Sequence, residues 1–184
     1  MLRALSRQAL TSLSYLGSRA HLTPQSITNL MELVGFIASN HFVDFGSAFA
    51  IPNVAVYALY GLQNEQNIGI AINTDLIEHC MRYNLPITIR QADICRLTRR
   101  DFNKVTVVWA FSKVFLAEVC SKLKYLVERA PHVRILITSE KVAESATQKF
   151  WAPMCWALLH QLRCKMAGCT SGFAMYVYRR NKLK

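Results

Sequence analysis

Short apolar segments rich in β-branched residues alternate with helical segments along most of this 184-residue chain, and this alternation constrains its fold more than any other feature. Uninterrupted apolar runs of this kind are typical of strands that are buried on both faces of a parallel sheet. We expect strands at 42–46, 67–72, 87–91, 105–110 and 133–138. The pattern predicts an α/β domain with a doubly wound, mostly parallel sheet and helices on both faces.

Helix signals lie between these strands. Thr23 and Pro24 can begin a helix as its N-cap and first residue, with Asn40 as a plausible stop. A helix over 53–60 can end at Gly61, which adopts the left-handed cap conformation readily. Further helices are expected from Asn73 or Thr74 to about Asn84 and over 115–128, and 140–153 is ambiguous.

Two more strand candidates close the chain, at 157–166 and 172–179, joined by a short glycine-containing linker. Strands that follow each other so closely pair antiparallel, so we expect a seven-stranded sheet with an antiparallel C-terminal edge. No segment after residue 24 has the composition of a linker. We therefore expect one domain over 23–184.

The first 22 residues differ from the rest because they contain arginines and hydroxyl side chains but no acidic residue. The apolar side chains recur at spacings of three and four and form one helical face: Leu2, Leu5, Ala9, Leu13 and Leu16. This combination is typical of a mitochondrial transit peptide and predicts the matrix as the compartment. The alternative is an ordinary N-terminal helix that docks on a partner.

The chain is strongly basic, with a formal net charge of +11 and a pI of about 9.7. Such an excess favours a polyanionic partner, either nucleic acid or an anionic membrane surface. Its longest apolar stretch is interrupted by Gly46, Ser47 and Pro52, so no membrane span is expected. Two clusters suit phosphate contacts: Arg96, Arg99, Arg100 and Lys104, and then Arg179, Arg180 and Lys182. A solvated face and a flexible tail are the alternative interpretations.

The six cysteines contain no C-x-x-C pair, which favours a reducing compartment over a disulfide scaffold. The nearest approach to a metal cluster is Cys155, His160, Cys164 and Cys169. On a strand, His160 and Cys164 would be about 13 Å apart, too far to share one ion. Buried free thiols are therefore favoured over a zinc site.

The turn after the first strand reads Asp44-Phe45-Gly46-Ser47-Ala48-Phe49-Ala50. It resembles the Asp-x-Gly-Ser-Gly-x-Gly turn of class I S-adenosylmethionine-dependent methyltransferases, above all the non-SET histone-lysine and protein-lysine enzymes. The resemblance covers most of 25–180. It implies a Rossmann-like methyltransferase fold with Asp44, Gly46, Ser47 and Asp93 at the cofactor site, Asp93 in the segment that contacts the adenine amine. A capping or loop role for Asp93 is equally open.

The sequence departs from that family where the chemistry resides. Ala48 and Ala50 replace two glycines, and each methyl group occupies space that a ligand would use. Ala71 stands where the family has the acidic residue that binds the ribose, and a charge-assisted hydrogen bond is worth about 1.5–3 kcal/mol. Phe111 and Ser112 replace two asparagines of the methyl-transfer pocket. The resemblance thus implies a pseudoenzyme without cofactor.

Together, fold, leader and charge favour a non-catalytic structural or assembly protein of the mitochondrial ribosome that contacts ribosomal RNA and neighbouring proteins. The alternative is an active protein or RNA methyltransferase that uses S-adenosylmethionine through Asp44, Gly46 and Asp93. A third hypothesis is a module that binds only proteins. No other catalytic set stands out, since the histidines are scattered singly.

Overall fold

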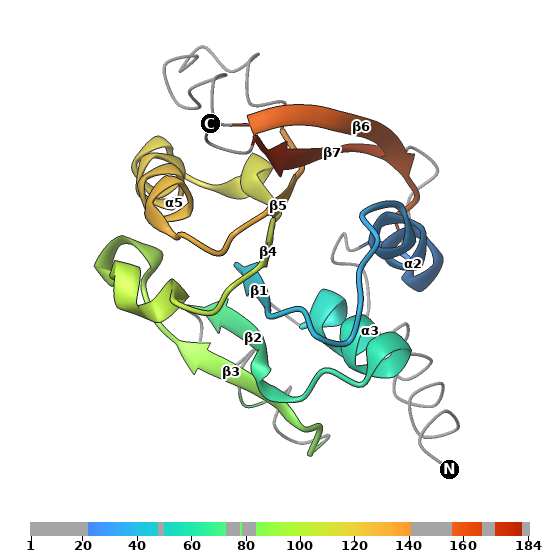
Figure 1. Cartoon of the computed structure of the whole chain (residues 1–184), viewed down its shortest axis with the longest axis horizontal. Coiled ribbons are helices and arrows are strands. Elements are labelled where there is room, and N and C mark those ends of the chain that lie inside the picture. The colour runs from blue at the N-terminus through green and yellow to red at the C-terminus, as the bar shows by residue number, and fades with distance from the viewer. Residues whose placement is uncertain are drawn as a thin grey trace.

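The computed structural model describes residues 22–47, 50–72, 78, 84–140, 156–166 and 172–181. Its centre is one seven-stranded sheet in the order β3-β2-β1-β4-β5-β7-β6 (Figure 1). The first five strands run parallel, and β7 lies antiparallel between β5 and β6. The strands are β1 Phe42–Phe45, β2 Asn64–Ala71, β3 Ile87–Gln91, β4 Val107–Ala110, β5 Ile135–Thr138, β6 Trp156–Cys164 and β7 Phe173–Arg180. The predicted fold class is confirmed, antiparallel edge included.

Helices cover both faces of this sheet (Figure 1). Helices α2 (Pro24–Leu33) and α3 (Ile51–Tyr60) pack on one face. The opposite face carries α5 (Ala117–Arg129) and two short 3-10 helices, η1 (Ile94–Arg96) and η2 (Arg99–Phe102). A third, η3 (Ser112–Val114), follows β4. Each face of the sheet therefore has its own hydrophobic core, as doubly wound folds require.

The ends of the first two described helices show which local signals are reliable. Thr23 caps α2 by accepting a hydrogen bond from the Ser26 amide, and Gly61 ends α3 at φ 72°, both as predicted. The prediction of Asn40 as the stop of α2 was wrong. The helix ends at Leu33, and Gly35 at φ 64° reverses the chain in a Schellman-type cap.

Some predicted segments lie outside the described residues: most of the leader, the helix expected from Asn73 or Thr74, and 141–153. Of the leader, Leu22 is described. It is buried and forms an isolated antiparallel β-bridge with Met166. Among the described helices, none is long and apolar enough to cross a membrane.

Candidate functional site

The turn after β1 lies at the carboxyl edge of the parallel strands, where open α/β sheets bind their ligands. The amides of Gly46 and Ser47 both donate to the Ile70 carbonyl oxygen on β2, at 2.9 and 3.0 Å. Ala50 then enters α3 in the left-handed conformation, at φ 53°. The chain therefore keeps a backbone conformation that favours glycine at a position that now holds alanine. Ala48 and Phe49 lie outside the described residues.

Asp44 is buried in β1, 2% exposed, between Gly69 of β2 and Trp109 of β4. No described group forms a hydrogen bond with its Oδ2 atom. Burial raises the pKa of this carboxyl well above its ordinary value. The Oγ atoms of Ser47 and Ser112 are likewise buried without a partner in the described part of the chain. This edge therefore holds three buried polar atoms that have no hydrogen-bond partner among the described residues.

Two glycines at this edge are in close contact with side chains. A β-carbon on Gly46 would lie 2.9 Å from Cε1 of Phe115, so the aromatic ring occupies the space beside that glycine. A β-carbon on Gly69 would lie 2.7 Å from the Ser47 Oγ atom. The turn after β1 therefore packs directly onto β2, and Phe115 covers Gly46.

The two described residues at the end of β2 carry no carboxylate. Ala71 is buried and Ile72, which follows it, is 71% exposed. At the end of β3, Asp93 Oδ1 accepts a hydrogen bond from the Cys95 amide at 2.8 Å and so caps η1. Its Oδ2 lies 3.9 Å from Nε of Arg96. Asp93 thus has the capping role that the sequence left open, with a side chain that is 39% exposed.

The two residues that replace the pocket asparagines take part in packing. The ring centroids of Phe111 and Phe173 are 5.7 Å apart, and Ser112 is buried. Neither supplies the amide acceptor of the family. With Ala71 at the end of β2 and Phe115 against Gly46, the described residues lack contacts that the resemblance implies for S-adenosylmethionine.

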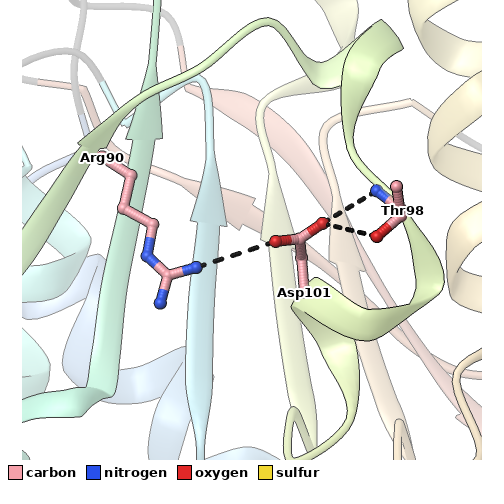
Figure 2. A network of polar contacts seen from close by, with 3 residues as sticks. All are labelled: Arg90, Thr98 and Asp101. Atoms are coloured by element: carbon pink, nitrogen blue, oxygen red, sulfur yellow. Dashed lines mark hydrogen bonds and ion pairs between the residues drawn. The ribbon is translucent and has the colours of Figure 1, made fainter.

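Asp101 links the η2 segment, which carries Arg99 and Arg100, to Arg90 of β3 through a network of polar contacts (Figure 2). Asp101 Oδ2 accepts hydrogen bonds from the amide and hydroxyl of Thr98 at 2.8 and 2.9 Å. Its Oδ1 lies 3.9 Å from Nη1 of Arg90. Arg99 and Arg100 lie between Thr98 and Asp101 in the sequence, and both are exposed in η2. They are therefore available to a phosphate, as is Arg96, whose side chain is 89% exposed.

The second cluster divides into residues with different roles. The Arg180 guanidinium donates to the carbonyl oxygens of Ala130, Val127 and Glu128 at the end of α5. We therefore omit Arg180 from the RNA-contacting set, because it caps a helix. Arg179 is exposed on the same strand, and Lys182 lies outside the described residues.

Sequence reasoning missed Arg134, an exposed residue just before β5. Its amide donates to the Thr106 carbonyl oxygen at 2.8 Å, and its carbonyl oxygen accepts from the Arg180 amide at 2.9 Å. It stands near Lys104, which precedes β4, because parallel strands begin at the same edge. The position of Arg134 and Lys104 just before two predicted parallel strands was the sequence signal that could have identified Arg134.

The aromatic residues near the basic clusters are part of the core. Phe102 is fully buried and stacks on Phe45 at 5.3 Å between ring centroids, and Tyr176 and Tyr178 are also buried. Of the candidate zinc ligands, Cys155 and Cys169 lie outside the described residues. The described residues contain no group of three metal-binding side chains. Cys164 is a buried free thiol, and burial raises its pKa to about 11.

No protein-family model and no curated protein matches this sequence. Solved structures match its fold. TrmN from Thermus thermophilus has a TM-score of 0.63 and 17% identity over 87% of this chain, which spans only 49% of TrmN. An RNA methyltransferase from Salinibacter ruber, in complex with S-adenosyl-L-homocysteine, has a TM-score of 0.57 and 18% identity, over 86% of this chain and 92% of its own. Thermoplasma acidophilum 1320 has a TM-score of 0.65 and 12% identity, over 97% and 99%.

These similarities establish the fold. The chain has the seven-stranded, Rossmann-like methyltransferase fold. At identities this low they do not establish activity. The closer resemblance to lysine methyltransferases stays a prediction.

Proposed function

We propose that this protein uses a methyltransferase fold to bind RNA without transferring methyl groups. The observation that carries the proposal is the state of the carboxyl edge. Ala71 places no carboxylate at the position where the resemblance expects the ribose acceptor, and the Phe115 ring covers Gly46. The sheet around that edge is nevertheless complete. A fold that keeps its core and loses its ligand contacts is suited to a scaffold role.

RNA is the partner that the charge favours. The chain carries a net charge of +11, and Arg96, Arg99 and Arg100 lie exposed on one loop. Phosphate contacts of this kind supply affinity without reading sequence. The RNA methyltransferase from Salinibacter ruber supports this choice, since its fold is similar. Within this proposal, the protein acts in the mitochondrial matrix as a structural or assembly component on ribosomal RNA, because its leader resembles a transit peptide.

The proposal is tested in mitochondria that express the protein with a C-terminal epitope. We expect it to sediment with ribosomal or pre-ribosomal particles, to crosslink to ribosomal RNA, and to leave those fractions after ribonuclease treatment. Sedimentation only as free protein, with no RNA crosslink, would contradict the proposal. Crosslinking also excludes a module that binds only proteins.

A second candidate function is an active methyltransferase with an altered cofactor site. The unpartnered Oδ2 of Asp44 and Oγ of Ser47 favour it, because buried polar atoms usually have partners. Transfer of a radiolabelled methyl group to mitochondrial RNA or protein tests this function directly. Transfer that disappears in Asp93→Ala would establish it in place of the scaffold.

A further inference from the structure

The amino edge of the sheet, opposite the degenerate cofactor edge, carries a groove of about 610 Å³. Strands β1, β4 and β5 begin there and the antiparallel β7 ends there, so segments from four parts of the chain line it. A second hollow of about 460 Å³ shares Thr106, Pro131 and Arg134 with the first. We call the two together the amino-edge groove.

The groove has an apolar floor and a basic rim. Phe36, Val107 and Ile135 lie buried beneath it, and Ile37 is 57% exposed beside them. The rim carries six exposed or half-buried basic side chains: His41, Lys104, His132, Arg134, Arg179 and the helix-capping Arg180. No acidic residue is among the described residues that line either hollow.

Three cations of the rim are not neutralised within the described structure. Lys104, Arg134 and Arg179 form no ion pair with any described carboxylate, whereas Arg90 and Arg96 each do. Like charges gathered on one edge repel each other, and an anionic ligand would relieve that repulsion. The electrostatics of the groove therefore favour a polyanion.

The backbone beneath the rim is fixed by hydrogen bonds that cross the sheet. Thr106 Oγ1 accepts from the His41 amide at 2.9 Å and from Asn40 Nδ2 at 3.1 Å. The Thr106 carbonyl oxygen accepts from the Arg134 amide, and the Arg134 carbonyl oxygen accepts from the Arg180 amide. Arg134 is thus held on both sides. A binding site built on strand ends is better ordered than one on a free loop.

We infer that the amino-edge groove binds single-stranded RNA, with phosphates on Arg134, Arg179 and Lys104 and a nucleobase against the apolar floor. Single-strand binders combine a basic groove that follows the backbone with side chains on which bases stack. Here the groove is basic, and Ile37 is the exposed apolar side chain beside its buried floor. A duplex keeps its bases stacked inside and would not use the floor. A flat lipid surface would reach the rim without filling the concave floor. This inference rests on the proposed RNA-binding function and places its contact surface.

The test measures binding of the full chain to a fluorescein-labelled oligouridine of about twelve nucleotides, by anisotropy across a salt series. Arg134→Glu and Arg179→Glu are each expected to weaken binding about tenfold or more and to reduce the salt slope by about 1. Lys113→Glu is the matched control, since it reverses an exposed charge after β4 at the opposite edge. Its affinity should stay within about twofold of the parent, apart from the general change in net charge.

Three results would overturn the inference. If only Arg99→Glu and Arg100→Glu weaken binding, the RNA surface is the loop of η2, and the proposed function stands without the groove. If the parent chain binds no RNA, the proposed function itself fails. If the rim variants abolish binding to anionic vesicles and leave RNA binding intact, the groove contacts lipid. Should a charge reversal lower the melting temperature, Arg134→Gln and Arg179→Gln provide the same comparison.

Discussion

The ring of Phe115 lies against Gly46, close enough that a β-carbon on the glycine would come within 2.9 Å of it. The two residues come from the turn after β1 and the end of η3, so they join the loops that follow β1 and β4. In this arrangement an aromatic side chain covers the one glycine that the turn has kept. The contact makes Gly46 a structural requirement of the fold, independent of any ligand.

Gly46→Ala should therefore destabilise the protein by about 2–4 kcal/mol, from a left-handed backbone and from displacement of the ring. Gly61→Ala is the matched control, because Gly61 has nearly the same φ and no atom within 4 Å of a β-carbon. It should cost about 1–2 kcal/mol. Chemical denaturation gives both values. In a Phe115→Leu background the excess cost of Gly46→Ala should shrink; an unchanged excess would exclude the ring contact.

Substitution of the neighbouring residues Arg179 and Arg180 on β7 should change the stability of the protein by different amounts. Arg180→Ala removes three hydrogen bonds to carbonyl oxygens at the end of α5 and should cost about 2–3 kcal/mol. Arg179→Ala alters an exposed side chain and should change stability by less than about 0.5 kcal/mol. Thermal denaturation distinguishes them. Equal effects on stability would show that Arg180 does not cap the helix.

A buried amide pair connects α3 to β2. Asn67 Nδ2 donates to the carbonyl oxygens of Asn53 and Leu62, and its Oδ1 accepts from Asn53 Nδ2 at 2.8 Å. Asn67→Ala leaves these groups unpaired and should cost about 2–4 kcal/mol. Gln25→Ala, which removes an exposed side-chain hydrogen bond to Asn29, should cost less than about 0.5 kcal/mol. Comparable losses in urea denaturation would refute the role of the buried pair.

Asp44 should make stability depend on pH. Burial raises its pKa in the folded protein above the ordinary value of 3.8. The folded state therefore binds the proton more tightly than the unfolded chain does. The stabilising contribution is complete below pH 3.8 and is lost as the pH rises toward the raised pKa.

Asp44→Asn keeps the shape and removes the titration. Its stability relative to the parent should rise as the pH increases from about 4 toward the raised pKa of Asp44, with a slope of at most about 1.4 kcal/mol per pH unit. Parallel profiles for the parent and Asp44→Asn would show that the carboxyl is not confined in an apolar site.

The fold could be predicted because its signals are local. Apolar runs marked five parallel strands, Thr23 marked the start of α2, and Gly61 marked the end of α3. The error at Asn40 arose because Gly35 is a stronger helix stop: it adopts φ 64° without steric cost. The first residues of β2 were missed because Asn64 and Glu65 are exposed and break the apolar pattern.

The site could be predicted only in part. Asp44, Gly46 and Ser47 lie together because they are adjacent in sequence. Neither the contact of Phe115 with Gly46 nor the helix cap by Arg180 could be predicted, since each depends on how distant segments pack. The amino-edge groove was missed for the same reason.

The central claim is that the carboxyl edge no longer holds the cofactor of its fold. Isothermal titration of the purified full chain with S-adenosylmethionine, and separately with S-adenosylhomocysteine, tests it most directly. We predict no saturable heat for either ligand up to about millimolar concentration. This result corresponds to a binding free energy weaker than about 4 kcal/mol. Saturable micromolar binding that is lost in Asp93→Ala would contradict the account.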